Sequence, residues 1–339
     1  MTKPIQLDGS DGGGQMLRTA LSLAMITGQP FRMTNIRGLR PRPGLMRQHL
    51  TCVKAACAIS DGTADGAEIG STELVFRAGQ VRGRSYQFAI GTAGSTGLLF
   101  QTLLPALWHA SETSTLVLEG GTHNPFAPPF EFLDRVFLPV LKSLGIDATL
   151  TLEETGFAPA GGGRISAVIQ PSGKPGVLDL HDRGEPLARS ITAVSRRLRD
   201  HIPGRMLDAA RELLQWEEGQ LEPRDAGPGV GACLLVEQRF EHAIELCSAF
   251  GEHGVMAEKV AHRAAKAMQN FIGSRAAVGR CLADQLLLPM ALASSGSFTT
   301  MAPDEHVPTN IGVIEKFLLV RFRIEDLPRG LKRISCETF

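Results

Sequence analysis

The chain has 339 residues, more than one hydrophobic core usually spans, so its length predicts two domains or one domain with a sizeable insert. Hydrophobic residues make up 43% of the chain and charged residues 21%, which is the composition of an ordinary soluble globular protein. The formal net charge is zero, which excludes a global field that attracts nucleic acid or an anionic membrane. Any site for a polyanion must therefore be local.

The N-terminus, MTKPIQLDGS, lacks the basic segment followed by an apolar segment that marks a signal peptide. No uninterrupted apolar run is long enough to cross a bilayer. We therefore expect a cytoplasmic protein with no membrane partner. Six cysteines are spread along the chain without a Cys-x-x-Cys pair or a matching Cys/His quartet, which favours free thiols over a structural zinc site.

Strand and helix patterns alternate in the N-terminal part of the chain, with the turn residues DGSDGGG between the first strand and the first helix. Gly28 closes that helix, as a glycine often does after the last helical residue. The predicted elements are a strand at 5–7, a helix at 15–26, a strand at 31–36, a helix at 45–59 and a strand at 73–77.

The same order of elements then recurs, which predicts an internal repeat. The second copy comprises a strand at 86–90, the turn GTAGST, a helix up to about His109, a strand at 115–119, a helix at 129–144 and strands near 147–153 and 164–170. A third, partial copy comprises a strand at 177–180, the helix RCLADQLLLPMALA, a strand at 298–301, a helix at 309–318 and the strand LVRFRI.

About ninety residues separate the first strand of the third copy from its first helix. This stretch, 183–275, is richer in charge and has strand and helix candidates of its own, so we interpret it as a small inserted α/β domain. Such an insert is tolerated where its two ends lie close together. The predicted fold is α+β: repeated units of two helices on a sheet form a large domain, 1–182 plus 276–339, and the third unit carries the insert.

A cluster of basic residues is the strongest local charge signal. The segment from Gly12 to Ser60 contains seven cations and no aspartate or glutamate. Arginine outnumbers lysine, which favours planar, bidentate recognition of phosphate over diffuse attraction. The alternative is a basic surface that pairs with acids from elsewhere in the chain. The cations are Arg18, Arg32, Arg37, Arg40, Arg42, Arg47 and Lys54.

Two loops in this segment could bind phosphate. The stretch IRGLRPRPGLMRQHL places arginines, Gln48 and His49 around prolines and glycines just before a helix, which suits a phosphate group or an RNA 3'-end. In DGSDGGGQ, successive glycines before a helix can form an anion-binding nest, and Asp11 could bring a divalent metal to a bound triphosphate. A plain tight turn remains the alternative for this loop.

His306 is the candidate nucleophile. It lies in PDEHVPTN, just after a predicted strand and three residues before Thr309, the predicted helix cap. Flanking prolines hold this loop in place, and an imidazole near neutral pH can attack a phosphorus atom to give a phosphoramidate. The other histidines are scattered, and each is more readily explained as a surface residue or a hydrogen-bonded core residue.

Taken together and in order, these motifs resemble the RNA 3'-terminal phosphate cyclase family. The resemblance extends from the N-terminus to about residue 320. It rests on the segments LDGSDGGGQMLRTALSLAMITGQPF, IRGLRPRPGLMRQHL, FAIGTAGSTGLLFQTLLPALW, GGTHNPFAPP, FAPAGGG, RDAGPG, AAVGRCLADQLLLPMALA and HVPTNIGVIEKFL.

The resemblance implies a reaction in three steps. A histidine takes AMP from ATP and releases pyrophosphate, AMP passes to an RNA 3'-phosphate, and the neighbouring 2'-OH attacks to give a 2',3'-cyclic phosphate. ATP and a divalent cation, Mg or Mn, are the implied cofactors, and RNA 3'-phosphate ends are the implied partner. Whether the chain forms a homodimer stays open. The implied fold is three repeated units like the C-terminal domain of translation initiation factor three, with an insert near 183–275.

The resemblance also assigns roles to individual residues. His306 matches the adenylated histidine, and Asp11 stands closest to the family's metal-binding carboxylate. The remaining assignments are Arg18 and Gln48 for the ATP phosphates, Arg37, Arg40 and Arg42 for the RNA phosphate end, and Gln101, Pro128, Asp284 and Gln285 for the nucleoside, with the proline against the adenine.

Two positions depart from the family pattern. The first loop of the family is usually DGSxGEGGGQ, with a glutamate that reaches the ATP-bound metal, whereas the loop here is shorter and offers Asp11. Cys281 stands where related cyclases often have an aromatic residue against the nucleotide. Because a thiol offers less contact area than an aromatic ring, we expect weaker or altered nucleotide selectivity.

Two other functions compete with the cyclase. A non-catalytic RNA-binding factor of the same fold, acting in ribosome assembly, would lack the nucleophile, so His306 beside Arg37, Arg40 and Gln48 argues against it. An enolpyruvyl-transferase-like enzyme has architecturally similar repeated units, but it would need motifs for its own anionic substrates, which the sequence does not contain.

Overall fold

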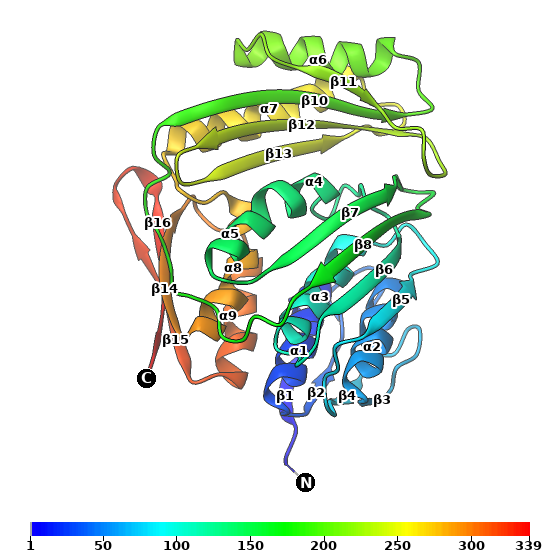
Figure 1. The fold of residues 1–339 in the computed structure, drawn as a ribbon, viewed down its shortest axis with the longest axis vertical. Helices are drawn as coiled ribbons and strands as arrows, with labels where there is room; N and C mark the ends of the chain where they lie inside the picture. The colour runs from blue at the N-terminus through cyan, green and yellow to red at the C-terminus, as the bar shows by residue number, and fades with distance from the viewer. Residues whose placement is uncertain (1) are drawn as a thin grey trace.

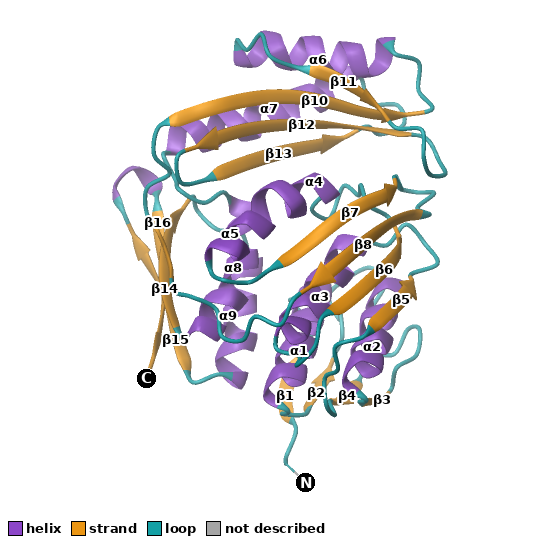
Figure 2. Cartoon of the chain, in the orientation of Figure 1, coloured by secondary structure: helices purple, strands orange, loops and turns teal. Residues whose placement is uncertain are grey.

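The computed structural model describes residues 2–339, and the strands in this range form four four-stranded sheets (Figure 1). The chain is therefore α+β, as predicted. Helices α1, α3, α8 and α9 occupy the middle of the molecule, between the sheet that contains β14 and the sheet that contains β6 (Figure 2). No helix within residues 2–339 is long and apolar enough to cross a membrane.

The first sheet has the strand order β1-β2-β4-β3. Strands β1 and β2 are parallel, and β4 is antiparallel to both of its neighbours. Helix α1 begins two residues before the predicted start, and β3 was not predicted because its three residues carry no apolar alternation. The elements in chain order are β1 (Ile5–Asp8), α1 (Gly13–Thr27), β2 (Phe31–Thr34), α2 (Arg47–Ser60), β3 (Thr63–Asp65) and β4 (Leu74–Arg77).

The second sheet has the order β5-β6-β8-β7, with the same pattern of one parallel and two antiparallel pairs. The helix predicted at 129–144 exists but contains a π-helical segment, which ends beside Pro139, a residue without an N–H to donate. The elements are β5 (Ser85–Ala89), α3 (Thr96–Trp108), β6 (Ser114–Gly120), α4 (Phe130–Phe132), the π-helix η1 (Leu133–Phe137), α5 (Leu138–Ser143), β7 (Ala148–Glu154) and β8 (Gly163–Ile169).

The third sheet joins β9 to strands from the C-terminal part of the chain, in the order β9-β14-β16-β15. Strand β9 pairs in parallel with β14, although more than a hundred residues lie between them in sequence. Strand β16 was not predicted, although Ile334 and Cys336 alternate inward along it. The elements are β9 (Leu178–Leu180), α8 (Arg280–Ala293), β14 (Ser295–Thr300), α9 (His306–Phe317), β15 (Val320–Asp326), the 3-10 helix η2 (Pro328–Gly330) and β16 (Lys332–Thr338).

The fourth sheet, β11-β10-β12-β13, is formed by the chain between β9 and α8 and lies at the top of Figure 1. Its helices α6 and α7 are amphipathic and bury one face each in a hydrophobic cluster that is separate from the main core. The elements are β10 (Pro186–Arg196), α6 (His201–Leu214), β11 (Gln220–Pro223), β12 (Gly231–Phe240), β13 (Ile244–Phe250) and α7 (Ala257–Ser274).

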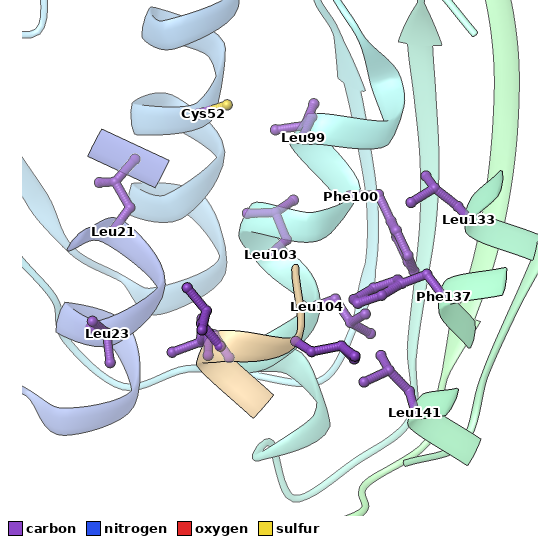
Figure 3. Packing of buried hydrophobic residues seen from close by; sticks show 14 of the residues in the cluster. Leu21, Leu23, Cys52, Leu99, Phe100, Leu103, Leu104, Leu133, Phe137 and Leu141 are labelled. Atoms are coloured by element: carbon purple, nitrogen blue, oxygen red, sulfur yellow. The ribbon is translucent and has the colours of Figure 1, made fainter. Parts of the chain in front are cut away.

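The main core forms around helices α1, α2, α3 and α9. Phe100 and Leu104 of α3 lie toward Leu133 and Phe137 of the segment that follows β6 (Figure 3). Helix α1 is buried along most of its length, and Arg18 is its one charged side chain. A single cation in so apolar a helix costs desolvation energy, so its position calls for an anionic partner.

Candidate active site

A cavity of about 1730 Å³ collects most of the predicted site residues. Its walls come from the first turns of several central helices, from the loop before α4, and from β13 and α7 of the fourth sheet. Asp11 and Arg42 are exposed on neighbouring loops and do not line it. The predicted residues in its wall are Arg18, Arg37, Arg40, Gln48, Gln101, Pro128, Asp284, Gln285 and His306.

Four helices present their N-termini to this cavity. Gly13 begins α1, Arg280 begins α8 and His306 begins α9, and all three line the wall, as does Gln48, the second residue of α2. The free N–H groups and the positive dipole ends of helix N-termini favour negative charge. Their convergence therefore makes the cavity suited to phosphate groups.

His306 is the first residue of α9, so the prediction that this helix starts at Thr309 was wrong. The prediction placed His306 and Pro308 in a loop and Thr309 at the helix cap, but a proline is tolerated in the first helical turn, where N–H groups have no intrahelical acceptor. The backbone N–H of His306 donates to Asp304 Oδ1 at 3.0 Å. The imidazole is exposed and lines the cavity, so it is accessible to a ligand.

Asp284 is the centre of a hydrogen-bond network that joins three helices. Gln15 Nε2 of α1 donates to one carboxylate oxygen, and Asn310 Nδ2 of α9 donates to the other at 3.1 Å. Thr19 Oγ1 in turn donates to Asn310 Oδ1 at 2.7 Å. Burial, with a smaller effect from the charge of Asp304, raises the pKa of Asp284. The network holds the carboxylate and His306 on a common framework.

Sequence reasoning missed three members of this network: Gln15, Thr19 and Asn310. A local signal existed for two of them, because Gln15 and Thr19 are polar residues one helical turn apart in a helix whose other residues are mostly apolar. Nothing in the sequence indicated that their partner is Asn310, which lies almost three hundred residues later along the chain.

The predicted nucleoside residues also meet. Gln101 Nε2 of α3 donates to Gln285 Oε1 of α8 at 2.6 Å, across a wide sequence separation. Pro128 is half-buried in the loop before α4 and lines the same cavity. Cys281, an exposed residue on the first turn of α8, completes this side of the cavity. Desolvation by the surrounding cavity walls, together with the charges of Glu245 and Asp304, raises the pKa of its thiol to about 11. The thiol is therefore neutral.

The arginine wall is strongly electropositive. Arg18, Arg37 and Arg40 form no ion pair within residues 2–339. Burial, followed by the charges of Arg18 and Arg37, lowers the pKa of His49 to about 3, and burial also lowers the pKa of Arg18. His49 Nδ1 accepts from the backbone N–H of Met46 at 3.2 Å, so the imidazole is a neutral part of the wall. These cations need an anion from outside the chain.

Two backbone features bring the arginines close to the first turn of α1. A Cβ on Gly14 would lie 2.3 Å from His49 Nε2 and 3.0 Å from Arg18 Nη1, so any other residue there would force these side chains to move. Arg37 has a φ of 56°, in the left-handed region that costs a non-glycine residue energy, and its N–H donates to Gly9 O at 2.9 Å. The strained backbone fixes where this arginine points.

Not every cation of the basic segment belongs to the cavity. Arg32 forms an ion pair with Glu73 at 2.7 Å. This residue fits the alternative explanation, in which basic residues of the segment pair with acids from elsewhere in the chain. Arg42, Arg47 and Lys54 are exposed and lie outside the cavity wall. The segment therefore divides into a group that lines the cavity and an ordinary basic surface.

A protein-only metal centre is absent from the described part of the chain. No group of three or more histidine, cysteine, aspartate or glutamate side chains in residues 2–339 is arranged to hold a metal ion. Asp11 is exposed in the loop between β1 and α1. A Mg²⁺ ion that binds with a nucleotide takes most of its ligands from phosphate and water, and it needs only one or two protein carboxylates.

Comparison with known proteins identifies the family. The family model described as RNA 3'-terminal phosphate cyclase matches residues 10–324. The RNA 3'-terminal phosphate cyclase of Pseudomonas fluorescens is 48% identical over 334 residues, which cover 98% of this chain and 97% of that protein. The protein of the same name from Ectopseudomonas mendocina is 49% identical over 334 residues, with 98% and 97% coverage.

A third relative, from Ralstonia nicotianae, carries the same name and is 47% identical over 324 residues, which cover 95% of this chain and 93% of that protein. Among solved structures, the enolpyruvyl transferase NikO from Streptomyces tendae aligns with 97% of this chain and 47% of its own, at a TM-score of 0.39 and 12% identity. Since the family model and the curated relatives both span nearly the whole chain, the chain belongs to the RNA 3'-terminal phosphate cyclase family.

Proposed function

We propose that the chain converts an RNA 3'-terminal phosphate to a 2',3'-cyclic phosphate at the expense of ATP, through AMP carried covalently on His306. The observation that carries this proposal is the position of His306. It lies at the N-terminus of α9, in the wall of the same cavity as Arg18, Arg37 and Arg40, where three cations have no partner among residues 2–339.

Each step is a displacement at phosphorus. The His306 nitrogen attacks the α-phosphorus of ATP, so that a P–N bond forms and the P–O bond to pyrophosphate breaks. An oxygen of the RNA 3'-phosphate then attacks the bound AMP, forming a P–O bond and breaking the P–N bond. Finally, the 2'-oxygen attacks the 3'-phosphorus, loses its proton, and AMP leaves. AMP is needed because oxide cannot leave a phosphate monoester at neutral pH.

The residues around His306 act by positioning and by balancing charge. Arg18, Arg37, Arg40 and Gln48 bind the phosphates of ATP and of the RNA end, and the four helix N-termini add N–H donors. Asp284 and the Gln101–Gln285 pair position the nucleoside, with Pro128 against the base. Reactions of this kind depend on alignment of the attacking and leaving groups, which a rigid framework supplies.

We also propose that ATP binds with a divalent cation, Mg²⁺ or Mn²⁺, and that Asp11 is the carboxylate that approaches it. When bound, such an ion neutralises part of the charge of the phosphates. An exposed carboxylate on the loop before α1 is compatible with water-mediated contact to an ion held mainly by phosphate. Arg42, which lies outside the cavity wall, is then left for RNA beyond the terminal phosphate.

For the architecture, we propose three repeated units like the C-terminal domain of initiation factor three, with a domain at 183–275 inserted in the third. The large domain then comprises 1–182 and 276–339. What supports this division is that β1-β2-β4-β3, β5-β6-β8-β7 and β9-β14-β16-β15 have one strand order and one pattern of parallel and antiparallel pairs. The fourth sheet has a different order, and its helices bury a core of their own.

The function is tested by covalent labelling. Wild-type protein incubated with α-labelled ATP and Mg²⁺ should take up a label that acid releases and base does not, as expected for a phosphoramidate. His306→Ala should take up none. His262→Ala removes an exposed histidine of α7 outside the cavity and should label normally. Absence of label on the wild-type protein would contradict the proposal and favour a non-catalytic RNA-binding factor.

A further inference from the structure

The cavity is larger than one nucleotide requires. Pockets for small molecules and cofactors usually have volumes of about 300–1,000 Å³. The cavity around His306 measures about 1730 Å³, so ATP leaves a large part of it unfilled. Under the proposed function the second occupant is the 3'-end of an RNA chain, which brings bases as well as its terminal phosphate. The assigned residues account for the phosphate and leave the RNA bases without partners.

Phe126 is an unusual member of the cavity wall. Its side chain is 96% exposed, the highest value among the large hydrophobic residues that are exposed in residues 2–339. It nevertheless lines the cavity, at the tip of the loop that connects β6 to α4. A phenylalanine gains free energy when it leaves water, so an open ring beside a ligand cavity needs an explanation.

The loop that carries Phe126 is anchored on both sides. Asn124 Nδ2 donates to Ala93 O on one side, and the backbone N–H of Phe130 donates to Thr122 O at 3.2 Å across the base of the loop. Prolines 125, 128 and 129 further restrict the backbone. The backbone of Phe126 is therefore held beside the cavity by a restrained loop, and its ring lies exposed there.

A buried charge cluster reinforces this anchor. His123 Nε2 lies 2.9 Å from Glu131 Oε2, and Arg224 Nη2 lies 2.9 Å from Glu131 Oε1. His123 and Glu131 are almost fully buried and bracket the loop, while Arg224 reaches them from the connection between β11 and β12. The two ends of the loop, at His123 and Glu131, are thus held to each other, and Arg224 connects them to the fourth sheet.

We propose that Phe126 is a stacking platform for a base of single-stranded RNA close to the 3'-phosphate, an inference that rests on the proposed function. Unpaired bases stack on exposed aromatic rings, and stacking tolerates any sequence because every base has a flat face. Pro128, two residues further along and half-buried, is left for the base of ATP. The exposed ring of Phe126 thus contacts the RNA base, and the half-buried Pro128 contacts the base of ATP.

The test compares the two half-reactions. With ATP saturating, Phe126→Ala should raise the KM for an RNA oligonucleotide with a 3'-phosphate about tenfold, which corresponds to about 1.4 kcal/mol. Its rate of self-labelling with ATP alone should be unchanged. Phe126→Trp should keep the wild-type KM for RNA, and Phe126→Leu should resemble alanine. Phe339→Ala, which removes a ring that is 72% exposed near the C-terminus, is the matched control and should change neither step.

Substrates with one base removed locate the stack. Among oligonucleotides with an abasic site at one of the last three positions, one should reproduce the tenfold rise in KM with wild-type protein. The same oligonucleotide should show no further rise with Phe126→Ala, because the partner is already missing. The proposal is overturned if Phe126→Ala leaves the KM for RNA unchanged, or if it raises the KM for ATP in self-labelling by the same factor.

Failure of the proposed function is distinguishable from failure of this inference. If wild-type protein takes up no label from ATP, the catalytic proposal fails, but RNA affinity can still be measured directly. Binding of a fluorescent oligonucleotide with a 3'-phosphate should then be about tenfold weaker for Phe126→Ala than for Phe339→Ala. If the two variants bind the oligonucleotide with equal affinity, the stacking role is refuted, whatever the labelling experiment shows.

Discussion

Glu245 is a buried carboxyl group in the cavity wall with an incomplete set of partners. It lies on β13 and is 6% exposed, and its Oε2 atom accepts no hydrogen bond from any residue in the range 2–339. The Cys247 thiol donates to Oε1 at 3.8 Å, and a Cβ on Gly279 would lie 2.1 Å from Oε2. Burial raises the pKa of Glu245 to about 8, so the group is neutral near pH 7.

This pKa predicts how stability changes with pH. The unfolded carboxyl group ionises near 4.5, whereas the folded one keeps its proton up to about 8, so raising the pH between these values favours the unfolded chain. Wild-type protein should lose a few kcal/mol relative to Glu245→Gln over this range, measured by urea unfolding from pH 4.5 to 8.5. Glu212→Gln, at an exposed position on α6, is the control. A difference that stays constant with pH would contradict the prediction.

At the scale of single residues, the sequence was informative about chemistry and uninformative about contact. His306 and the arginines were chosen as candidates from residue type, motif and family resemblance, and the structure places His306, Arg18, Arg37 and Arg40 in one cavity wall. The pairing of Asp284 with Gln15 and Asn310 was not, because the three residues lie on different helices and leave no local pattern. The same holds for Glu245, whose neighbour Gly279 precedes α8.

Helix α7 has two faces with different roles. One face is buried in the fourth sheet and contains Val260, Ala264 and Met268. The other lines the cavity with Arg263 and Asn270, which are two helical turns apart. The element thus joins the separate core of the fourth sheet to the cavity.

Arg263 tests what this face contributes. Its guanidinium pairs with Glu252 and keeps other donors free for an RNA phosphate. Arg263→Ala should raise the KM for the RNA oligonucleotide about fivefold, with a weaker dependence on salt, because one phosphate contact is lost. Arg205→Ala removes an arginine of similar exposure that pairs with Glu258 of α7 outside the cavity, and it should leave the KM unchanged. Equal effects of the two substitutions would show that the face contributes only general charge.

Element boundaries show where local signals mislead. The start of α9 was predicted three residues late because Thr309 was interpreted as the helix cap, although the first turn of a helix accepts a proline such as Pro308. Strand β16 was missed although its inward residues alternate. The remaining strands and helices of the first two sheets were predicted close to their observed bounds, apart from the short strand β3, since apolar periodicity and glycine turns are local properties.

At the scale of the whole molecule, Arg224 connects the fourth sheet to Glu131 of helix α4. The Arg224 guanidinium pairs with Glu131 at 2.9 Å, and Arg196 Nη1 donates to the backbone O of Arg224 at 2.9 Å. Burial alone would raise the pKa of Glu131, but His123 and then Arg224 outweigh it and bring the pKa to about 2. The ionised carboxylate therefore stabilises the fold above about pH 4.5, and this contribution is lost as the pH falls toward 2.

Removing the Arg224–Glu131 ion pair should destabilise the protein. Arg224→Met leaves a buried carboxylate with one partner fewer, and we expect a loss of about 3 kcal/mol in the free energy of unfolding at pH 7. The deficit should shrink at pH 3, because loss of Arg224 raises the pKa of Glu131 in the variant, whose carboxyl group is then protonated at a higher pH than that of the wild type. Arg77→Met breaks an exposed pair with Asp65 and should cost less than about 1 kcal/mol. The expectation is wrong if urea unfolding at pH 7 gives equal values for both variants.

The sequence by itself determined the fold class, most helices and strands, the family and the candidate residues for the chemistry. Each of these follows from local periodicity or from short motifs. Only the tertiary structure decided which residues share the cavity: it brought His306, Asp284 and Arg18 together, left Asp11 and Arg42 outside, and paired Arg32 with Glu73. The physical reason is that hydrogen bonds, ion pairs and burial depend on contacts between segments far apart in the chain.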